Sequence, residues 1–298
     1  MTRGRVVTLA ALGALSLIWG TQYLVIRVTQ AELPPWRAIA LRFAVVAILG
    51  QVAVLAMRAR APAGTVGLRV AMGVTQAVSM GLLYAGQQRI ASALASVLMA
   101  TTPIFVVAIA HRFLRERLVG RTVVAGLLGV AGIVLVSGAR WDDRLAAAGV
   151  ALVVGAAIVS AISKTIGKAI TDLPIAVLLR DLGAVVALFG LTAGVTLESG
   201  EPWALDTREL AGAIYLGAIA STGANAVYFL LLRGMDISRI SYLQFISASV
   251  GLVAGVLFAG EQLEARALAG AALVLVGAAV HASAASAKKR SEPVVRAE

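Results

Sequence analysis

Two arginines and one aspartate lie well inside long apolar stretches of this sequence. Arg42 lies about seven residues, or about 10 Å, inside its stretch, and Arg180 lies at a similar depth in another. A charge at that depth is costly unless it is paired or hydrated, so by default it indicates a functional site. We expect each of these arginines either to bind an anion, such as the carboxylate of a solute or of a gate, or to bond a free backbone carbonyl or extend to the interface.

Asp181 directly follows Arg180. Adjacent side chains project about 100° apart on a helix, so these two are not expected simply to neutralise each other. Asp181 is therefore expected to serve in proton coupling or to pair with another helix.

Polar and aromatic side chains form stripes at helical spacing on several apolar segments. Single polar residues often only hold helices together, whereas stripes on several segments at once are better explained by a path that water and a solute can enter. The stripes are neutral and aromatic, which suits a zwitterion or a mixed apolar and polar solute. Together with the two arginines, the candidate binding residues are Trp19, Gln22, Tyr23, Arg42, Gln76, Tyr84, Ser96, Met99, Pro103, Arg180, Asn225, Tyr228 and Gln244.

Pro103 falls near the middle of an apolar segment. Because proline has no N–H, the carbonyl of Met99 should lose its helical partner. A free carbonyl in the middle of a membrane is tolerated only where protein or water satisfies it. The sequence therefore predicts either a kink that faces a solute or a packing contact with a neighbouring helix.

Other reactive groups are scarce. The chain has no cysteine, and its two histidines, His111 and His281, lie at segment ends, which favours interfacial positions over a proton relay. No spacing suggests a metal site, no phosphate-binding glycine loop is present, and no cofactor is expected. Glu116 and Glu261 each begin a segment, and we expect the dipole at the start of that helix to explain them better than a gate does.

The elements that position these residues must be membrane spans. Hydrophobic residues make up 60% of the 298 residues, charged residues only 14%, and the mean hydropathy is +0.91. A soluble fold could not bury so much apolar surface, so a soluble enzyme, a disordered chain and a secreted disulfide scaffold are excluded. Apolar windows of about 20 residues predict ten transmembrane helices, at about 6–26, 37–57, 66–86, 90–111, 121–138, 146–166, 174–196, 210–232, 239–259 and 266–284.

The basic residues are unevenly distributed over the ends of these spans. With a cytoplasmic N-terminus, 17 of the 26 Lys and Arg residues fall at inner ends and 7 at outer ends, which predicts that both termini are cytoplasmic. This bias also explains the net charge of +11 without nucleic acid as a partner. The excess of Ala, Val, Gly and Arg is typical of GC-rich bacterial genes, so we expect a multi-pass protein of the bacterial inner membrane, surrounded by its lipids.

The two halves of the sequence resemble each other. LPPWRAIALRF matches LPIAVLLRD, which places Arg42 opposite Arg180 at an offset of 138, and Glu116 matches Glu261 at an offset of 145. Each half has five spans, so the second copy would enter the membrane upside down, as in many transporters. We expect one domain at residues 1–140, a second at 141–286 and a polar cytoplasmic tail at 287–298.

These features together resemble the drug/metabolite transporter superfamily, in its ten-span branch with two EamA-type repeats. The resemblance covers about residues 6–284, and it implies an all-α integral membrane protein with ten transmembrane helices as two inverted five-helix repeats. In one respect the chain departs from the pattern, because Ala248 stands where the second repeat often has proline, which does not favour a symmetric pair of kinks. The residues that carry the resemblance are Trp19-Gly20, Pro35, Leu41-Arg42-Phe43, Pro103 and the elements at 115–136 and 260–280.

The resemblance implies a secondary transporter, not an enzyme, that exports small metabolites without ATP hydrolysis, with amino acids as the preferred substrates. We expect alternating access at a central cavity between the halves, and proton coupling is left open. One alternative is a drug or nucleotide-sugar carrier of the same fold. An intramembrane lipid-modifying enzyme is an alternative of another class, but it would need clustered acid, base or metal-binding residues near the interface.

Overall fold

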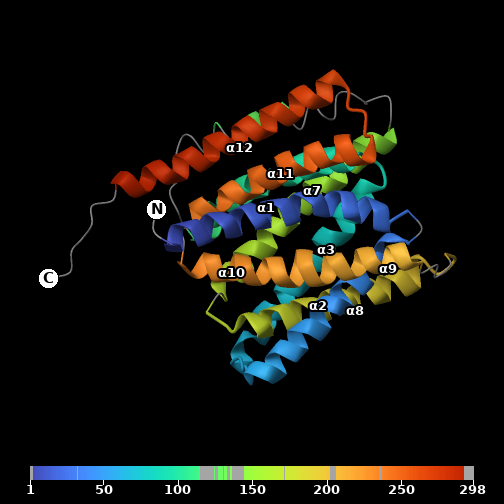
Figure 1. Ribbon diagram of the computed structural model, residues 1–298, viewed down its shortest axis with the longest axis vertical. Helices are drawn as coiled ribbons and strands as arrows, with labels where there is room; N and C mark the ends of the chain where they lie inside the picture. Colours follow the sequence, from blue (N-terminus) through green and yellow to red (C-terminus); the bar gives the residue numbers. More distant parts are fainter. Residues whose placement is uncertain are drawn as a thin grey trace.

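The helices form one bundle in which the start of α1 and the end of α12 lie at the same end (Figure 1). The structure, a computed structural model, describes residues 3–31, 33–114, 144–170, 172–201, 206–234 and 237–291, with a few positions between 124 and 135. All the elements in this part are helices: α1 (Arg3–Thr29), α2 (Pro35–Met57), η1 (Ala63–Thr65), α3 (Val66–Gln87), α4 (Ser92–Met99), α5 (Thr102–Leu114), α7 (Arg144–Ala169), α8 (Ile175–Leu197), α9 (Thr207–Ile214), η2 (Tyr215–Gly223), α10 (Ala224–Gly234), α11 (Ile237–Ala259) and α12 (Ala265–Ser291).

The described helices include apolar segments long enough to cross a membrane. Large side chains such as Leu55, Leu188 and Leu257 are 67%, 67% and 69% exposed, as expected for a surface that faces lipid. The fifth predicted span, 121–138, falls mostly outside the described residues, so the count of ten helices stays a prediction. The six long segments are Ala10–Thr29, Pro35–Met57, Ala63–Gln87, Arg144–Ala169, Ile175–Leu197 and Thr207–Leu231, and three shorter ones are Ser92–Val106, Ile246–Ala259 and Ala265–Gly277.

Helices α2 and α8 pack on each other more extensively than any other pair among the described helices. Both have 23 residues, and each begins directly after a proline in an extended conformation, Pro34 or Pro174. A proline at this position is tolerated because the first N–H groups of a helix have no partner within the helix. The two helices thus start and end 140 residues apart.

Close backbone contacts between α2 and α8 follow the same offset. A Cβ atom at Gly50 would lie 2.5 Å from the backbone nitrogen of Arg180, and one at Gly190 would lie 3.0 Å from the backbone nitrogen of Ala40. The residue numbers of the two glycines differ by 140, and so do those of Ala40 and Arg180. The two contacts are therefore equivalent, with the roles of α2 and α8 exchanged. This packing offset of 140 differs by two residues from the offset of 138 predicted for the sequence match.

The fourth predicted span is broken into α4 and α5 just before Pro103. As the missing N–H predicts, the carbonyl of Met99 takes a side-chain partner, the Thr102 hydroxyl at 2.7 Å, and the Thr101 hydroxyl donates to the carbonyl of Leu98, also at 2.7 Å. Helix α11, which has Ala248 at the matching place, runs unbroken. The expected lack of a symmetric pair of kinks is therefore observed.

The eighth predicted span contains a π-helix. Its middle part, η2, lies between α9 and α10, and the Thr222 hydroxyl donates to the carbonyl of Gly217 at 2.9 Å, five residues back. π-helical turns are rare in proteins, and those that occur are often found at functional sites. This segment packs against both α1 and α2.

The C-terminal helix extends beyond its predicted end. Helix α12 continues to Ser291, so residues 287–291 of the predicted tail are helical. An alanine-rich stretch precedes them, and alanine is the strongest helix former. Near the start of α12, a Cβ atom at Gly132 would lie 2.6 Å from the carbonyl oxygen of Gly270, so these two glycines allow a close backbone approach.

Candidate functional site

Arg42 is the centre of a buried polar cluster formed by four elements. Its Nε donates to the Ser221 hydroxyl at 2.9 Å, one terminal nitrogen to the Tyr84 hydroxyl at 3.3 Å, and the other to the Gln22 side-chain oxygen at 3.0 Å. The four residues come from α2, η2, α3 and α1 respectively. Arg42 itself is only 4% exposed. Three of the predicted site residues, Gln22, Arg42 and Tyr84, are therefore in direct contact.

The charge of Arg42 has no counter-charge in this cluster. The ion pairs in the described part of the chain involve other arginines, and the three partners of Arg42 are all neutral. A guanidinium has five N–H donors, so three bonds leave two that an anion could accept. A buried charge without an opposite charge is costly, and a carboxylate that binds two guanidinium N–H groups side by side is its most favourable partner.

An aromatic pair lies next to this cluster. The rings of Trp19 and Tyr228 are 5.3 Å apart between centroids and tilted by 53°. The Trp19 indole N–H donates to the carbonyl of Ala220 at 3.1 Å, one residue before Ser221. The π-helix thus bonds Trp19 through its backbone and Arg42 through a side chain. The aromatic surface of Trp19 and Tyr228 therefore lies near the Arg42 guanidinium.

Tyr23 lies in the same core and belongs to a reciprocal link between α1 and α3. The Gln87 side-chain amide donates to the carbonyl of Tyr23 at 3.0 Å, and the Gln30 amide donates to the carbonyl of Tyr84 at 3.1 Å. The amide oxygens of both glutamines are buried and have no partner among the described residues. Gln87 thus joins the end of α3 to α1.

Six of the predicted site residues are not brought to Arg42 by any described contact. Gln76, Asn225 and Gln244 are half-buried and make no side-chain hydrogen bond in the described part of the chain. Ser96 bonds the carbonyls of Ala93 and Ala248 at 2.7 and 3.2 Å, which ties α4 to α11. The remaining two, Met99 and Pro103, are buried at the helix break described above.

Arg180 belongs to a separate ion cluster. Its Nε lies 2.6 Å from one carboxylate oxygen of Asp181, and the other oxygen bonds Arg69 of α3. The expectation that Arg180 and Asp181 do not neutralise each other is wrong, because the long arginine side chain folds back to its neighbour. The expected pairing of Asp181 with another helix is observed. We call the end of the bundle that holds these residues the Arg69 end.

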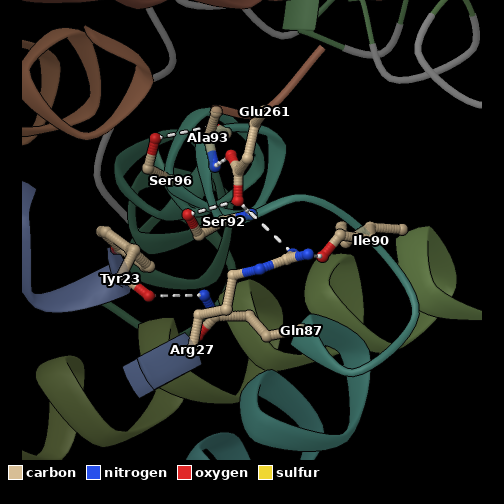
Figure 2. Close-up of polar contacts among 8 residues, drawn as sticks. All are labelled: Tyr23, Arg27, Gln87, Ile90, Ser92, Ala93, Ser96 and Glu261. Atoms are coloured by element: carbon tan, nitrogen blue, oxygen red, sulfur yellow. Dashed lines mark hydrogen bonds and ion pairs between the residues drawn. The ribbon is translucent and has the colours of Figure 1, made fainter. Parts of the chain in front are cut away.

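The opposite end of the bundle, called the Glu261 end, contains a carboxylate at the start of a helix (Figure 2). One Glu261 oxygen accepts hydrogen bonds from the backbone N–H and the hydroxyl of Ser92, both at 2.8 Å, and the other accepts the N–H of Ala93 at 2.9 Å. Arg27 of α1 lies 3.4 Å from the first oxygen. The sequence predicted that Glu261 stabilises the helix that follows it, whereas it bonds the start of α4.

A backbone turn directs Glu261 toward α4. Helix α11 ends at Ala259, and Gly260 has a φ of 61°, which only glycine adopts without strain. The N–H of Glu261 then bonds back to the carbonyl of Gly255 at 3.2 Å. A cavity of about 280 Å³ adjoins this turn and is lined by Arg27, Arg89, Leu94, Glu261 and Glu264 among others.

Three partners of these clusters were not predicted from the sequence, namely Ser221, Arg69 and Arg27. Ser221 lies four residues before Asn225 in a predicted span, but this part of the span is π-helical, so α-helical spacing does not place it. The two arginines were counted only as residues at span ends. Glu116 lies outside the described residues, as do the side chains of His111 and His281.

Comparison with known proteins identifies the family. The model of the EamA-like transporter family matches residues 6–138 and 147–282. The chain belongs to this family. The resemblance to the drug/metabolite transporter superfamily is thereby confirmed, and this EamA-family protein is a multi-pass membrane transporter, not an enzyme.

Two relatives of this EamA-family protein carry names that agree with transport. An uncharacterized transporter of Archaeoglobus fulgidus is 26% identical over 260 residues, which cover 87% of this chain and 92% of the relative. A probable amino-acid metabolite efflux pump of Salmonella typhimurium is 24% identical over 275 residues, which cover 88% and 90%. A solved crystal structure that is 19% identical matches with a TM-score of 0.68 over 94% of this chain and 98% of that one, so the fold is shared.

Proposed function

We propose that this protein is a secondary transporter that exports small metabolites, with amino acids as the preferred class. The observation that carries the proposal is the buried Arg42 with neutral partners and two remaining N–H donors. An amino acid would bring the missing carboxylate, and the adjoining pair of Trp19 and Tyr228 would accept its apolar part. The name of the Salmonella typhimurium relative, probable amino-acid metabolite efflux pump, supports this class.

Alternating access between inverted repeats is the second part of the proposal. It is supported by helix contacts that occur twice, once in each half. Helix α1 packs on α11, and the corresponding helices α7 and α4 also pack on each other. Helix α3 packs on α7 and α8, and the corresponding segment η2 packs on α1 and α2. The reciprocal contacts of Gly50 and Gly190 support the same relation. A site between such halves can open toward either side of the membrane.

Arg42 should be tested first by transport itself. The purified protein is reconstituted into liposomes, and uptake of amino acids, amines and nucleotide sugars is compared. We expect amino acids to be transported, Arg42→Gln to abolish this transport with the protein still folded, and Arg60→Gln, a control at an exposed loop position, to transport like the parent. Transport of amines alone, or undiminished transport by Arg42→Gln, would contradict the assignment.

We further propose that the Arg69 end faces the cytoplasm of a bacterial cell, with both termini inside, because 17 of 26 basic residues then fall at inner ends. The chain has no cysteine, so single cysteines report cleanly. A cysteine at Ser291 should resist an impermeant thiol reagent added to intact cells, and one at Ser199, which follows α8, should react. The reverse pattern would overturn the orientation.

Proton coupling remains a prediction. It would appear as export driven by an imposed pH gradient in the same liposomes. Asp181 is the acidic side chain within a described span that the sequence singled out, but it is held by two arginines. We therefore expect a coupled proton, if one is used, not to be carried by Asp181.

A further inference from the structure

Helix α4 lacks a local cap at its first turn. Its N-cap residue is Ala91, whose side chain cannot accept a hydrogen bond, although Ser, Thr, Asp or Asn at that place would do so. The cap comes instead from Glu261, 169 residues away in the chain. The first turn of α4 is therefore satisfied only while the turn between α11 and α12 stays against it.

The contact at Glu261 lies above a continuous packing of α4 on α11. One helical turn below Ser92, the Ser96 hydroxyl bonds the carbonyl of Ala248 at 3.2 Å, and a Cβ atom at Gly251 would lie 2.5 Å from the Cβ of Ser96. A Cβ atom at Gly255 would meet the Glu261 carboxylate and lie 2.8 Å from the Cβ of Ala93. No space for a solute remains between the helices along these contacts.

Helix α4 is also a short unit that ends at a break. It has only eight residues, and it ends at the break before Pro103, where Thr101 and Thr102 satisfy the interrupted carbonyls with their hydroxyls. Breaks of this kind are where helices bend. The Glu261 side chain is 5% exposed, but its partner Arg27 is 46% exposed, so solvent screens that ion pair and the bonds to α4 dominate.

We propose that Glu261 is the latch that closes the substrate path at the Glu261 end of the bundle. The bonds of Glu261 to Ser92 and Ala93 are drawn in Figure 2. While they are formed, α4 is held on α11 and the proposed path is closed. With these bonds broken, α4 tilts at the break and the path opens. The inference rests on the proposed alternating access, and it adds a positioning residue that does not contact the solute.

The test measures opening without any substrate, so that it can fail or succeed independently of the proposed transport. Ser96→Cys is a reporter that lies under the latch, fully buried. Its reaction with an impermeant thiol reagent, in the reconstituted protein and from the Glu261 side, should be slow with the native Glu261. Because three charge-assisted hydrogen bonds are lost, Glu261→Ala should speed labelling by about tenfold or more.

A second variant breaks the latch without changing its charge. Gly255→Ala places a methyl group against the Glu261 carboxylate and Ala93. It should speed labelling of Ser96→Cys as Glu261→Ala does, and it keeps the test decisive if Glu261→Ala does not fold. Gly13→Ala, at a position with nothing within 4 Å, is its matched control.

Two further controls separate opening from general loosening. Glu264→Gln removes the same charge from the wall of the same cavity, and it should leave Ser96→Cys labelling unchanged. Leu94→Cys, which lines the cavity, should react at similar rates with and without the latch. Equal labelling of Ser96→Cys in the parent, Glu261→Ala and Gly255→Ala would show that Glu261 is a fixed structural cap and would overturn the proposal. If these variants label Ser96→Cys faster but the parent protein transports no amino acid, the proposed role of Glu261 stands and the proposed substrate class is rejected.

Discussion

Gly50 and Arg180 meet backbone to backbone, so closely that a single added carbon at Gly50 would lie 2.5 Å from the Arg180 nitrogen. Gly50→Ala must therefore push α2 and α8 apart along the most extensive contact between described helices. Overpacking of this kind costs about 1–3 kcal/mol. We expect a lower melting temperature in detergent, measured by thermal unfolding.

The matched control for this substitution is Gly13→Ala, whose added carbon meets nothing within 4 Å. It should leave the melting temperature unchanged or raise it slightly, because alanine favours the helix. Equal melting of Gly50→Ala and Gly13→Ala would mean that α2 and α8 do not approach as closely as described.

Removing the charge of Asp181 should destabilise the Arg69 end. Asp181→Asn leaves Arg69, whose side chain is 9% exposed, without its ion pair, and breaking a buried pair from one side costs about 3 kcal/mol or more. The cost should fall below that figure because Asp181 and Arg180 are 19% and 30% exposed. Thermal unfolding of the parent and variants measures it.

A double-mutant cycle checks the assignment of this effect. Asp181→Asn combined with Arg69→Gln should be more stable than the sum of the two single losses predicts, because the second change removes the unpaired charge. Strict additivity would show that Asp181 and Arg69 do not interact.

Glu198 should make stability depend on pH. It follows α8 and accepts the backbone N–H groups of Trp36 and Arg37 at 2.9 and 3.2 Å. Burial raises the pKa of the Glu198 carboxyl above its ordinary value, although these bonds and the charge of Arg37 oppose the rise. The folded state then holds the proton more tightly than the unfolded state, so this contribution is full below the unfolded pKa and is lost as pH rises through the folded pKa.

The measurement is the melting temperature across about pH 4 to 7, in the parent and in Glu198→Gln. The variant cannot titrate at this position, so its melting temperature should decline less with rising pH than that of the parent. A steeper decline in Glu198→Gln would reverse the assigned sign.

Tyr84→Phe should weaken substrate binding without disturbing the core. The ring stays in its buried place, and only the hydroxyl that accepts from Arg42 at 3.3 Å is lost. That hydroxyl holds one terminal nitrogen of Arg42 in place for the proposed substrate carboxylate, so its loss should raise KM for amino acids several-fold through poorer positioning of the guanidinium. Tyr215→Phe is the matched control, because the Tyr215 hydroxyl lies 3.4 Å from Thr21 and does not contact Arg42.

Helical periodicity could predict the parts of this molecule that depend on local sequence. The apolar windows predicted the described spans, and the missing N–H of Pro103 predicted that the Met99 carbonyl would lose its helical partner. Two polar stripes and one intramembrane charge singled out Gln22, Tyr84 and Arg42, and the structure shows that Gln22 and Tyr84 both bond Arg42. These inferences hold because each depends on which face of a single helix a residue occupies.

The remaining contacts depend on how helices meet, which one sequence does not encode locally. Ser221 reaches Arg42 because a π-helix changes which face it occupies, and no residue type announces that turn. Glu261 bonds a helix other than its own because Gly260 reverses the chain. Arg180 pairs with Asp181 because a flexible side chain overrides the angle between neighbouring positions.

The break before Pro103 makes the two halves mechanically unequal. An eight-residue rod that pivots on a threonine pair can swing with little displacement of its neighbours, whereas the unbroken α11 must move as a lever of 23 residues. In the proposed alternating-access cycle, a gate built on α4 would therefore move fewer residues than one built on α11. The two halves of that cycle would then differ in rate for a reason of architecture, before any ion gradient is applied.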